Sequence, residues 1–455
     1  MAENGLIADL VLRGGRVHVL DAEDTRATAV AVTDGRIVAV GADTDMTPLI
    51  GVGTEVVELD GRALLPGIND AHLHASWLGA LWPQTVFGGP QLPADGPLST
   101  TREQRREALL RAAEVMSSLG ITSYTEPGIG TGEDDGPTGC FGSEVLEIYR
   151  ELADEGALRQ RVTLLLLFGL LDGAASTTDV LDGIAAADTA TADPRSLRIA
   201  GLKVFADGIP PMRSAYIHGT YVDGSHGELL LDGADDRERE RRLHEIVLAA
   251  QRAGLQIAVH ATGDRAIDVF VQAVGAAQDE HPADLRHYLV HADLLRDETI
   301  PALVRQGMGA TLQAGIAAFT AEWAGSAFAD DDGPAMWPLE HLVRAGAPFT
   351  LSSDAPVMAP DWRAELAAAD RLLGAASDPV ARLHELLRRI TAVPAWQDHA
   401  EDWKGTVEVG KVADLVVLSE DPDEVGAQGL PGILIERTYL GGAVVYDAAT
   451  APVAN

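Results

Sequence analysis

The chain has 455 residues, of which 46% are hydrophobic, and its 34 basic and 69 acidic residues give a net charge of −35. This length and composition are typical of a globular enzyme with one large domain and a smaller one, and they exclude a disordered or fibrous protein. The strong negative charge argues against nucleic acid or an anionic membrane as a partner.

The sequence also bounds the compartment and the assembly. Its single cysteine, Cys140, allows no intramolecular disulfide, which fits a reducing cytoplasm. The N-terminus has no basic segment followed by an apolar one, and apolar runs such as residues 162–169 are too short to span a bilayer. We therefore expect a cytoplasmic protein that acts on a small molecule. Base rates favour a homodimer.

Both ends of the chain predict short β-strands. Apolar runs bounded by turn residues occur at 6–12, 16–20, 29–33, 36–40 and 55–59, and again at 413–418, 433–440 and 443–446. The pair Asp34-Gly35 between two of these runs is a strong signal for a tight hairpin. We predict that residues 1–62 and 405–455 pack together as one small β-sandwich domain.

The middle of the chain alternates strand-like runs with helical patterns. We predict strands at Ala63–Ile68, Ile121–Glu126, Val162–Gly169, Arg198–Phe205, Gln256–His260, Tyr288–His291, Gly309–Gln313 and Phe349–Ser353. We predict helices at Thr101–Leu119, Ser143–Glu155, Arg237–Ala253, Ala266–Gln278, Asp297–Gln306 and Leu339–Ala345. Eight strands that alternate with helices predict an α/β fold, a (β/α)8 TIM barrel over residues 63–404.

Two histidines follow the first of the predicted barrel strands. His72 and His74 are spaced i, i+2, so an extended segment points both imidazoles to the same side, as a metal site requires. On its own this pattern is more often incidental than functional. What makes a functional role more convincing is the set of polar residues at the ends of the other predicted strands.

Other polar residues stand where further predicted strands end, which is where barrel active sites form. They are Glu126, Lys203, His260, His291 and Asp354. Imidazoles suit Zn²⁺ and similar ions, and a bound divalent cation lowers the pKa of water to about 7. Asp354 would take the proton of that water and pass it to the leaving group. A buried Lys203 would lose its proton readily and react with CO2 to give a carbamate that bridges two metals.

Several motifs match a known family. They are Pro66-Gly67-x-x-Asp70-x-His72-x-His74, Lys203-x-Phe205-Ala206-Asp207-Gly208, His260-Ala261-x-Gly263-Asp264-Arg265, Arg286 to His291, Ser353-Asp354-Ala355-Pro356 and Gly410-Lys411-x-Ala413-Asp414. The chain resembles the amidohydrolase superfamily and, within it, the YtcJ-like amidohydrolase 3 group, which includes N-substituted formamide deformylases.

The resemblance implies a binuclear site. It implies that His72, His74 and Asp354 bind one metal ion, and that a carboxylated Lys203 bridges to a second ion bound by His260 and His291. It also makes Asp354 the general base and then the general acid. Zn²⁺ is the expected metal, and Mn²⁺, Fe²⁺ and Co²⁺ tolerate the same ligands.

The chain departs from the pattern of the group in three ways. Val290 occupies the position before His291 where the group usually has a glutamate, and Gln313-Ala314 replaces a Gln-Pro pair of the group. The chain also lacks most of an insertion after the H-x-H motif. The substrate pocket is therefore the part that the resemblance transfers least.

Five further residues are candidates for supporting the ligands or contacting the substrate. Glu126 is either a metal ligand or a supporting group, and Asp207 and Asp264 either hold ligands by hydrogen bonds or serve as helix caps or ion pairs. Arg213 matches a family position near the substrate, with a surface ion pair as the alternative. Trp77 lines the pocket or belongs to the core.

Three functions stay open. The first is a metal-dependent hydrolase that cleaves a non-peptide C–N bond of an amide, formamide, carbamate or urea by metal-activated hydroxide. The second is a mononuclear deaminase of the same superfamily, which would need a glutamate soon after His260, where the chain has Ala261-Thr262-Gly263-Asp264. The third is a catalytically inactive barrel, against which the full set of ligands argues.

Overall fold

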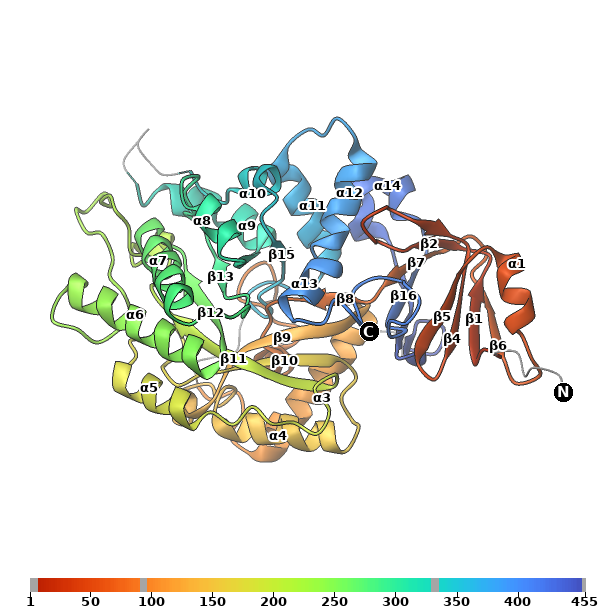
Figure 1. The fold of residues 1–455 in the computed structure, drawn as a ribbon, viewed down its shortest axis with the longest axis horizontal. Helices are drawn as coiled ribbons and strands as arrows, with labels where there is room; N and C mark the ends of the chain where they lie inside the picture. The colour runs from red at the N-terminus through yellow and green to blue at the C-terminus, as the bar shows by residue number, and fades with distance from the viewer. Residues whose placement is uncertain (1–6, 91–95, 329–334, 452–455) are drawn as a thin grey trace.

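The computed structural model describes residues 7–90, 96–328 and 335–451 (Figure 1). Eight parallel strands form one sheet in which sequential strands are neighbours, from β8 to β15. They are β8 (Ile68–Asp70), β9 (Ile121–Ile129), β10 (Arg161–Leu166), β11 (Leu197–Phe205), β12 (Gln256–Ala261), β13 (Tyr288–His291), β14 (Gly309–Leu312) and β15 (Phe349–Leu351). The sheet curves into a nearly closed barrel, which confirms the predicted α/β barrel fold.

Helices follow the strands and pack their apolar faces against the sheet. They are α2 (Ala75–Leu81), α3 (Arg102–Ser118), α4 (Ser143–Asp154), α5 (Thr177–Ala186), α6 (Asp236–Ala253), α7 (Asp264–Glu280), α8 (Ile300–Arg305), α9 (Ala314–Gly325), α10 (Leu339–Ala345), α11 (Trp362–Leu373), α12 (Pro379–Arg388) and α13 (Ala392–Gln397). The six predicted helices are all present. One large apolar cluster joins strands and helices, and its buried residues include Leu164, Leu202, Ile246 and Phe270.

The two ends of the chain form two further sheets, as the sequence predicts (Figure 1, red and blue strands). One has the order β5-β4-β1-β6 and the other β18-β17-β16-β7-β2-β3. Their strands are β1 (Leu10–Arg13), β2 (Arg16–His18), β3 (Arg26–Ala27), β4 (Ala29–Thr33), β5 (Arg36–Gly41), β6 (Glu55–Glu58), β7 (Ala63–Pro66), β16 (Leu415–Leu418), β17 (Ile435–Leu440) and β18 (Ala443–Asp447). Leu12, Val32 and Leu64 share a buried cluster with Leu415 and Tyr439, so the ends are packed together.

The hairpin between β4 and β5 forms at the predicted Asp34-Gly35 pair. Asp34 has φ +48° and Gly35 has φ +72°, so both central residues adopt the left-handed backbone of a primed turn. A side chain at Gly35 would bring its Cβ to 2.8 Å from the carbonyl oxygen of Gly441. The close approach of these two turns therefore requires glycine here.

The position of the first barrel strand corrects one prediction. The predicted strand Ala63–Ile68 is two strands, because β7 pairs with β16 and β2 in the small sheet and only β8 pairs with β9 in the barrel. The chain passes from one sheet to the other at Gly67, where a Cβ would lie 2.1 Å from Thr122 Oγ1. An apolar run through Pro-Gly reads as one strand, whereas the backbone changes sheets there. The proposed division into domains at residues 62/63 and 404/405 stays a prediction.

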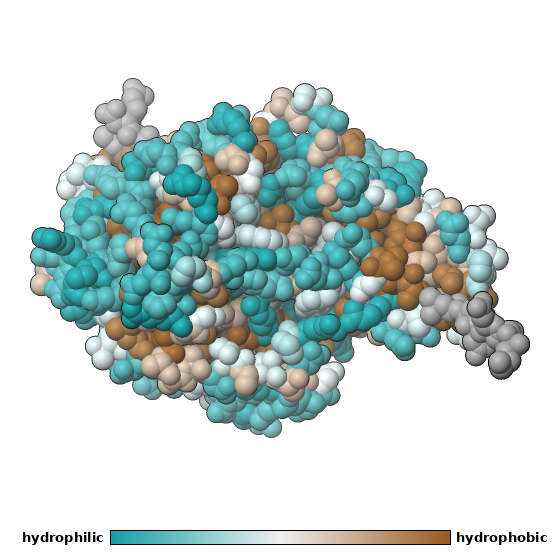
Figure 2. Space-filling model, viewed as in Figure 1, coloured by the Kyte–Doolittle hydropathy of each residue, from teal (hydrophilic) through white to brown (hydrophobic). Residues whose placement is uncertain are grey.

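The surface matches the charge of the chain. Figure 2 shows a mainly hydrophilic face, with an apolar area near the small sheets at the right of the view. Over the described ranges, no helix combines the length and apolar character needed to cross a membrane.

An ion pair between barrel and small sheet yields the first prediction. Arg161 of β10 donates two hydrogen bonds to Asp414, at 2.6 and 2.9 Å, and Asp414 also accepts the backbone N–H of Gly441. Both side chains are largely buried. Asp414→Ala would leave Arg161 buried without its partner, so we expect the free energy of unfolding in urea to fall by about 3 kcal/mol.

The exposed pair of Arg102 and Glu151 is the control. Glu151→Ala should change the free energy of unfolding by less than about 1 kcal/mol. Equal effects of the two substitutions would mean that the Arg161–Asp414 pair does not hold the two sheets together.

Candidate metal centre

The barrel closes where its first and last strands meet. Just beyond β8 and β15, the Asp354 N–H donates to the His72 carbonyl at 2.9 Å, and the His74 N–H donates to the Ala355 carbonyl at 2.7 Å. Asp70 adds a third link, because it accepts a hydrogen bond from the Ser353 hydroxyl at 2.6 Å. The closure therefore sets the two histidines of the H-x-H motif beside Asp354.

Four imidazoles lie in a row at this end of the barrel. Successive ring centroids are 5.4 Å apart between His74 and His72, 5.6 Å between His72 and His291, and 4.5 Å between His291 and His260. The rings come from the loop after β8, from β13 and from β12. The structure thus brings together the four histidines that the sequence places at separate strand ends.

Asp354 faces the first two rings of the row. Its Oδ1 lies 3.2 Å from His72 Nε2 and 3.5 Å from His74 Nε2, and all three side chains are buried. One ligand atom from each of the three lies within 4.8 Å of the others. Within the described chain, His72 Nδ1 and His74 Nδ1 are buried and have no hydrogen-bond partner. The Nε2 atoms of both rings face Asp354, while Glu126 Oε1 lies 3.4 Å behind His74 Nδ1, so the Nε2 atoms are the ones placed to bind a cation.

The electrostatics favour neutral imidazoles at His72, His260 and His291 and a protonated imidazole at His74. Burial lowers the pKa of His72 to about 3, and it lowers the pKa values of His260 and His291 as well. Burial also disfavours the charged form of His74, but its interactions with the Asp354 and Glu126 carboxylates, which accept hydrogen bonds from the imidazolium, outweigh burial and raise its pKa to about 9. His74 thus carries a proton at neutral pH, and a bound cation would replace that proton.

Asp354 is held as a carboxylate. Burial alone would raise its pKa, yet His72, His74 and His291 outweigh burial and keep the pKa well below the usual range. Its backbone has φ +54°, and that of His291 has φ +71°. Left-handed backbone is uncommon outside glycine, although Asp and His adopt it more readily than most residues, and such positions cluster at functional sites.

Lys203 lies on β11 at the floor of the same site. It is 2% exposed, and its Nζ stands 4.9 Å from the centre of the Phe205 ring. Burial lowers its pKa to about 8, so a minor but much larger fraction of the amine than for an ordinary lysine is neutral and nucleophilic near neutral pH. That is the form which reacts with CO2.

Gln313 fixes the orientation of His291. Its amide oxygen accepts a hydrogen bond from His291 Nδ1 at 2.8 Å, and its amide nitrogen donates to the Ser352 hydroxyl at 2.8 Å. A carbonyl oxygen only accepts, so Nδ1 carries the hydrogen and Nε2 keeps its lone pair. The sequence presented Gln313 only as part of an altered Gln-Pro pair, and nothing in the sequence indicated this contact.

Glu126 supports His74. The carboxylate is completely buried, with Oε1 3.4 Å from His74 Nδ1. Oε2 accepts the Ala75 N–H at 2.7 Å and the Tyr149 hydroxyl at 2.8 Å. Sequence reasoning missed Tyr149, because it lies on a helical face that predicts only core packing.

Asp207 holds the loop that follows His260. Its carboxylate accepts the backbone N–H groups of Thr262, Gly263 and Tyr216 at 2.8 to 3.0 Å. Asp264 accepts the N–H of His218 at 3.0 Å. Neither side chain lines the cavity described below, so both act through the backbone around the site.

Arg213 and Trp77 differ in their relation to the site. Arg213 forms an exposed ion pair with Asp223 at 2.8 Å and lies outside the cavity lining. Trp77 lines the cavity, with its ring centroid 6.1 Å from that of His74. Val290, at the position of the missing glutamate, belongs to a small apolar cluster inside the barrel.

A cavity of about 410 Å³ opens over these groups. Its polar floor includes His72, His74, Lys203, His260, His291 and Asp354. Its walls are mainly apolar, and among them are Trp77, Phe87, Leu171, Phe205 and Ile316. The volume suits a small organic molecule.

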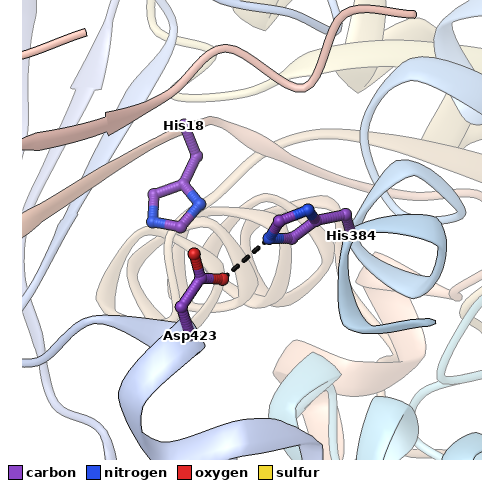
Figure 3. Close-up of side chains that lie close together, drawn as sticks. All are labelled: His18, His384 and Asp423. Atoms are coloured by element: carbon purple, nitrogen blue, oxygen red, sulfur yellow. Dashed lines mark hydrogen bonds and ion pairs between the residues drawn. The ribbon is translucent and has the colours of Figure 1, made fainter. Parts of the chain in front are cut away.

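A second group of potential metal ligands lies at the edge of the barrel (Figure 3). His18 of β2, His384 of α12 and Asp423 of α14 (Pro422–Gly429) converge there. In contrast to the first group, every imidazole nitrogen has a partner. His384 Nε2 contacts Asp423 at 2.7 Å and its Nδ1 contacts Asp24 at 2.8 Å, while the nitrogens of His18 contact Asp421 and Arg26.

The second group already contains a cation. The Arg26 guanidinium contacts both rings and donates to Asp423 at 2.8 Å. A metal ion would have to displace this guanidinium, so the group is better described as an arginine-centred hydrogen-bond network. Two histidines and an aspartate therefore form a candidate metal centre at His72, His74 and Asp354, but a hydrogen-bond network around Arg26 at His18, His384 and Asp423.

Comparison with known proteins agrees with this reading of the fold. Residues 89–446 match the model of the Amidohydrolase family. The N-substituted formamide deformylase of Arthrobacter pascens is 24% identical over 96% of this chain and 98% of its own. An uncharacterized metal-dependent hydrolase from Pyrococcus furiosus has a TM-score of 0.71 at 20% identity, over 91% of this chain and 99% of its own. An adenosine deaminase from Xanthomonas campestris with bound zinc has a TM-score of 0.66 at 17% identity, over 99% of this chain and 95% of its own.

The fold and the site define a barrel hydrolase of the metal-dependent kind. The chain belongs to the amidohydrolase family, whose model covers most of its length. It is accordingly a hydrolase that acts on C–N bonds of small molecules. The matched range contains Lys203, His260, His291 and Asp354 but begins after the H-x-H motif.

The contrast between the two groups yields a prediction. His72→Ala should weaken binding of Zn²⁺ by more than about a hundredfold, which exceeds the effect of losing a merely supporting residue. His18→Ala should leave the affinity unchanged, because Arg26 and the carboxylates already satisfy that group. Isothermal titration of metal-stripped protein with Zn²⁺ measures both. Equal losses in the two variants would contradict the assignment of the metal centre.

Proposed function

We propose that this protein hydrolyses a non-peptide C–N bond of an amide, formamide, carbamate or urea, with formamides as the first class to test. The observation that carries the proposal is the convergence of His72, His74 and Asp354, with unpartnered imidazole nitrogens, at the floor of a cavity with apolar walls. The similarity to an N-substituted formamide deformylase over nearly the whole chain supports the choice of formamides.

Two divalent ions are proposed as cofactors, with Zn²⁺ as the first choice. His72, His74 and Asp354 would hold one ion, and a carboxylated Lys203 would link it to another held by His260 and His291. Bound ions of this kind polarise a carbonyl group and lower the pKa of water to about 7. The zinc in a barrel of similar fold supports the choice of metal.

Asp354 is the proposed general base and acid. It is a buried carboxylate with a lowered pKa, beside two imidazoles at the centre of the site. It would accept a proton from the attacking water and donate it to the nitrogen of the leaving group as the C–N bond breaks. For an amide or formamide, the overall reaction consumes one water and releases a carboxylic acid and an amine; for a carbamate or urea, the acid product is a carbonic or carbamic acid derivative.

A mononuclear deaminase is the alternative. The ligand atoms of His72, His74 and Asp354 alone lie within 4.8 Å of one another, which is compatible with a single ion. Against it, the residues after His260 provide no glutamate, and Asp264 is bound to the backbone of His218. The number of metals per chain distinguishes the two hypotheses.

The first measurement is metal content together with the intact mass of the native protein. We expect about two metal ions per chain and an added mass of about 44 Da, that of CO2. Lys203→Met should abolish the added mass and lower kcat/KM for formamides by more than about a thousandfold, since it removes a bridging ligand. One metal per chain without the adduct would favour the deaminase, and no metal after reconstitution with CO2 and divalent ions would overturn the proposal.

Glu126 is proposed as a positioning residue for His74. Its Oε1 faces His74 Nδ1, while Ala75 and Tyr149 hold the rest of the carboxylate in place. A carboxylate behind a metal-binding imidazole fixes the orientation of the ring and raises its basicity. The substrate does not need to contact Glu126 for this effect.

Glu126→Gln keeps the shape of the side chain and removes its charge. We expect Zn²⁺ affinity and kcat/KM to fall by about tenfold to a hundredfold, with little change in Tm. Tyr149→Phe is the matched control, since it removes one hydrogen bond and leaves the carboxylate. Glu126 would have only a structural role if Glu126→Gln lowered Tm as much as truncation of a core side chain does and left the metal affinity unchanged.

A further inference from the structure

The cavity is strongly biased in charge. Of the described residues that line it, Lys203 is the only lysine or arginine, and it lies at the floor among the candidate metal ligands. Arg213, on the adjoining loop, is paired with Asp223 outside the lining. The chain segments 1–6, 91–95, 329–334 and 452–455 contain no lysine or arginine in their sequence, so they supply no further cation.

Acidic groups, in contrast, face the same space. Asp172 and Asp293 both line the cavity. Asp293 accepts the indole N–H of Trp337 at 3.1 Å, which holds its carboxylate in the lining. Asp172 is exposed at the mouth, in the loop after β10.

The mouth of the cavity is apolar. On α9, Phe319 and Trp323 are exposed, and Phe319 stacks on the lining residue Phe87 with ring centroids 5.0 Å apart. Leu170 and Met212, also exposed, precede and follow the lining residues Leu171 and Pro211. Exposed large apolar side chains gathered at one opening mark a binding surface for an apolar group.

We propose that the substrate carries a bulky apolar group and is neutral or cationic, that carboxylate-bearing compounds such as N-acyl amino acids are rejected, and that Asp172 is the residue which selects the charge. A substrate carboxylate that lies against the apolar walls, away from the floor, would lose its hydration, and no lysine or arginine of the described lining stands there to compensate. An ammonium group at the mouth would meet Asp172. This inference rests on the proposed function for the reaction itself.

The test uses three formamides of phenethylamine that share the same bond and ring. The para position carries hydrogen, a carboxylate or an aminomethyl group, which is cationic at neutral pH. We expect kcat/KM for the carboxylate to lie at least about tenfold below that for the neutral compound. The cationic compound should match or exceed the neutral one.

Asp172→Asn isolates the proposed residue. Asn tolerates the left-handed backbone of this position, where φ is +49°, so the loop should keep its shape. We expect the ratio of the cationic to the neutral kcat/KM to fall by about fivefold. Asp182→Asn, an equal charge change on the exposed face of α5, is the matched control and should leave the ratio unchanged. Equal turnover of the carboxylate and neutral compounds, or an unaltered ratio in Asp172→Asn, would overturn the inference.

A binding measurement separates this inference from the reaction. Methanesulfonamides of the same three amines have no carbonyl to cleave, and their affinities are measured by the fluorescence of Trp77 and Trp323 in the lining. Weak binding of the carboxylate, together with a loss of cation preference in Asp172→Asn, would support the pocket assignment even if no formamide is cleaved. Equal affinities for all three would overturn it even if formamides are cleaved.

Discussion

The site depends on the way the barrel closes. Strands β8 and β15 are short, and the contacts that join them lie just beyond their ends, between His72 and Asp354 and between His74 and Ala355. The same backbone segments that close the barrel carry the H-x-H motif and the aspartate. Asp70 strengthens this join by accepting the Ser353 hydroxyl. The geometry of the candidate ligands and the closure of the barrel are therefore one constraint, because any shift of one edge strand would separate His72 and His74 from Asp354.

Buried polar groups then support three of the four imidazoles or the backbone beside them. Gln313 sets the tautomer of His291, Glu126 stands behind His74, and Asp207 organises the backbone that follows His260. Each of these groups is buried, so its hydrogen bond has no competition from water. The result is a row of imidazoles held in place before any ligand arrives. Pre-organisation of this kind is what a metal site with catalytic geometry requires.

The sequence predicts the barrel and the residues at its strand ends because both follow short-range rules. Apolar runs of strand length predict strands, and parallel strands place their carboxyl ends at one face. What the sequence does not reveal depends on long-range contacts. The change of sheet at Gly67 is set by the approach of Thr122. The sequence prediction missed α9 because its apolar residues are spread around the helix and form no single face, whereas α11 and α12 have an apolar face that the sequence pattern carries. The contacts of Gln313 and Tyr149, and the place of Asp172 at the mouth, come from segments far apart in the chain.

The two histidine groups show why residue type alone does not define a metal site. Both contain two histidines and an aspartate with converging ligand atoms. At His18 and His384 every ring nitrogen is hydrogen-bonded, and Arg26 supplies the positive charge. At His72 and His74 a buried nitrogen on each ring lacks a partner within the described chain, and the neighbouring cation, Lys203, has a lowered pKa. Burying a polar atom without a partner is costly. The arrangement at His72 and His74 is therefore stabilised when a ligand compensates for this cost. The unmet hydrogen-bonding capacity, more than the residue types, distinguishes the candidate metal centre from a structural network.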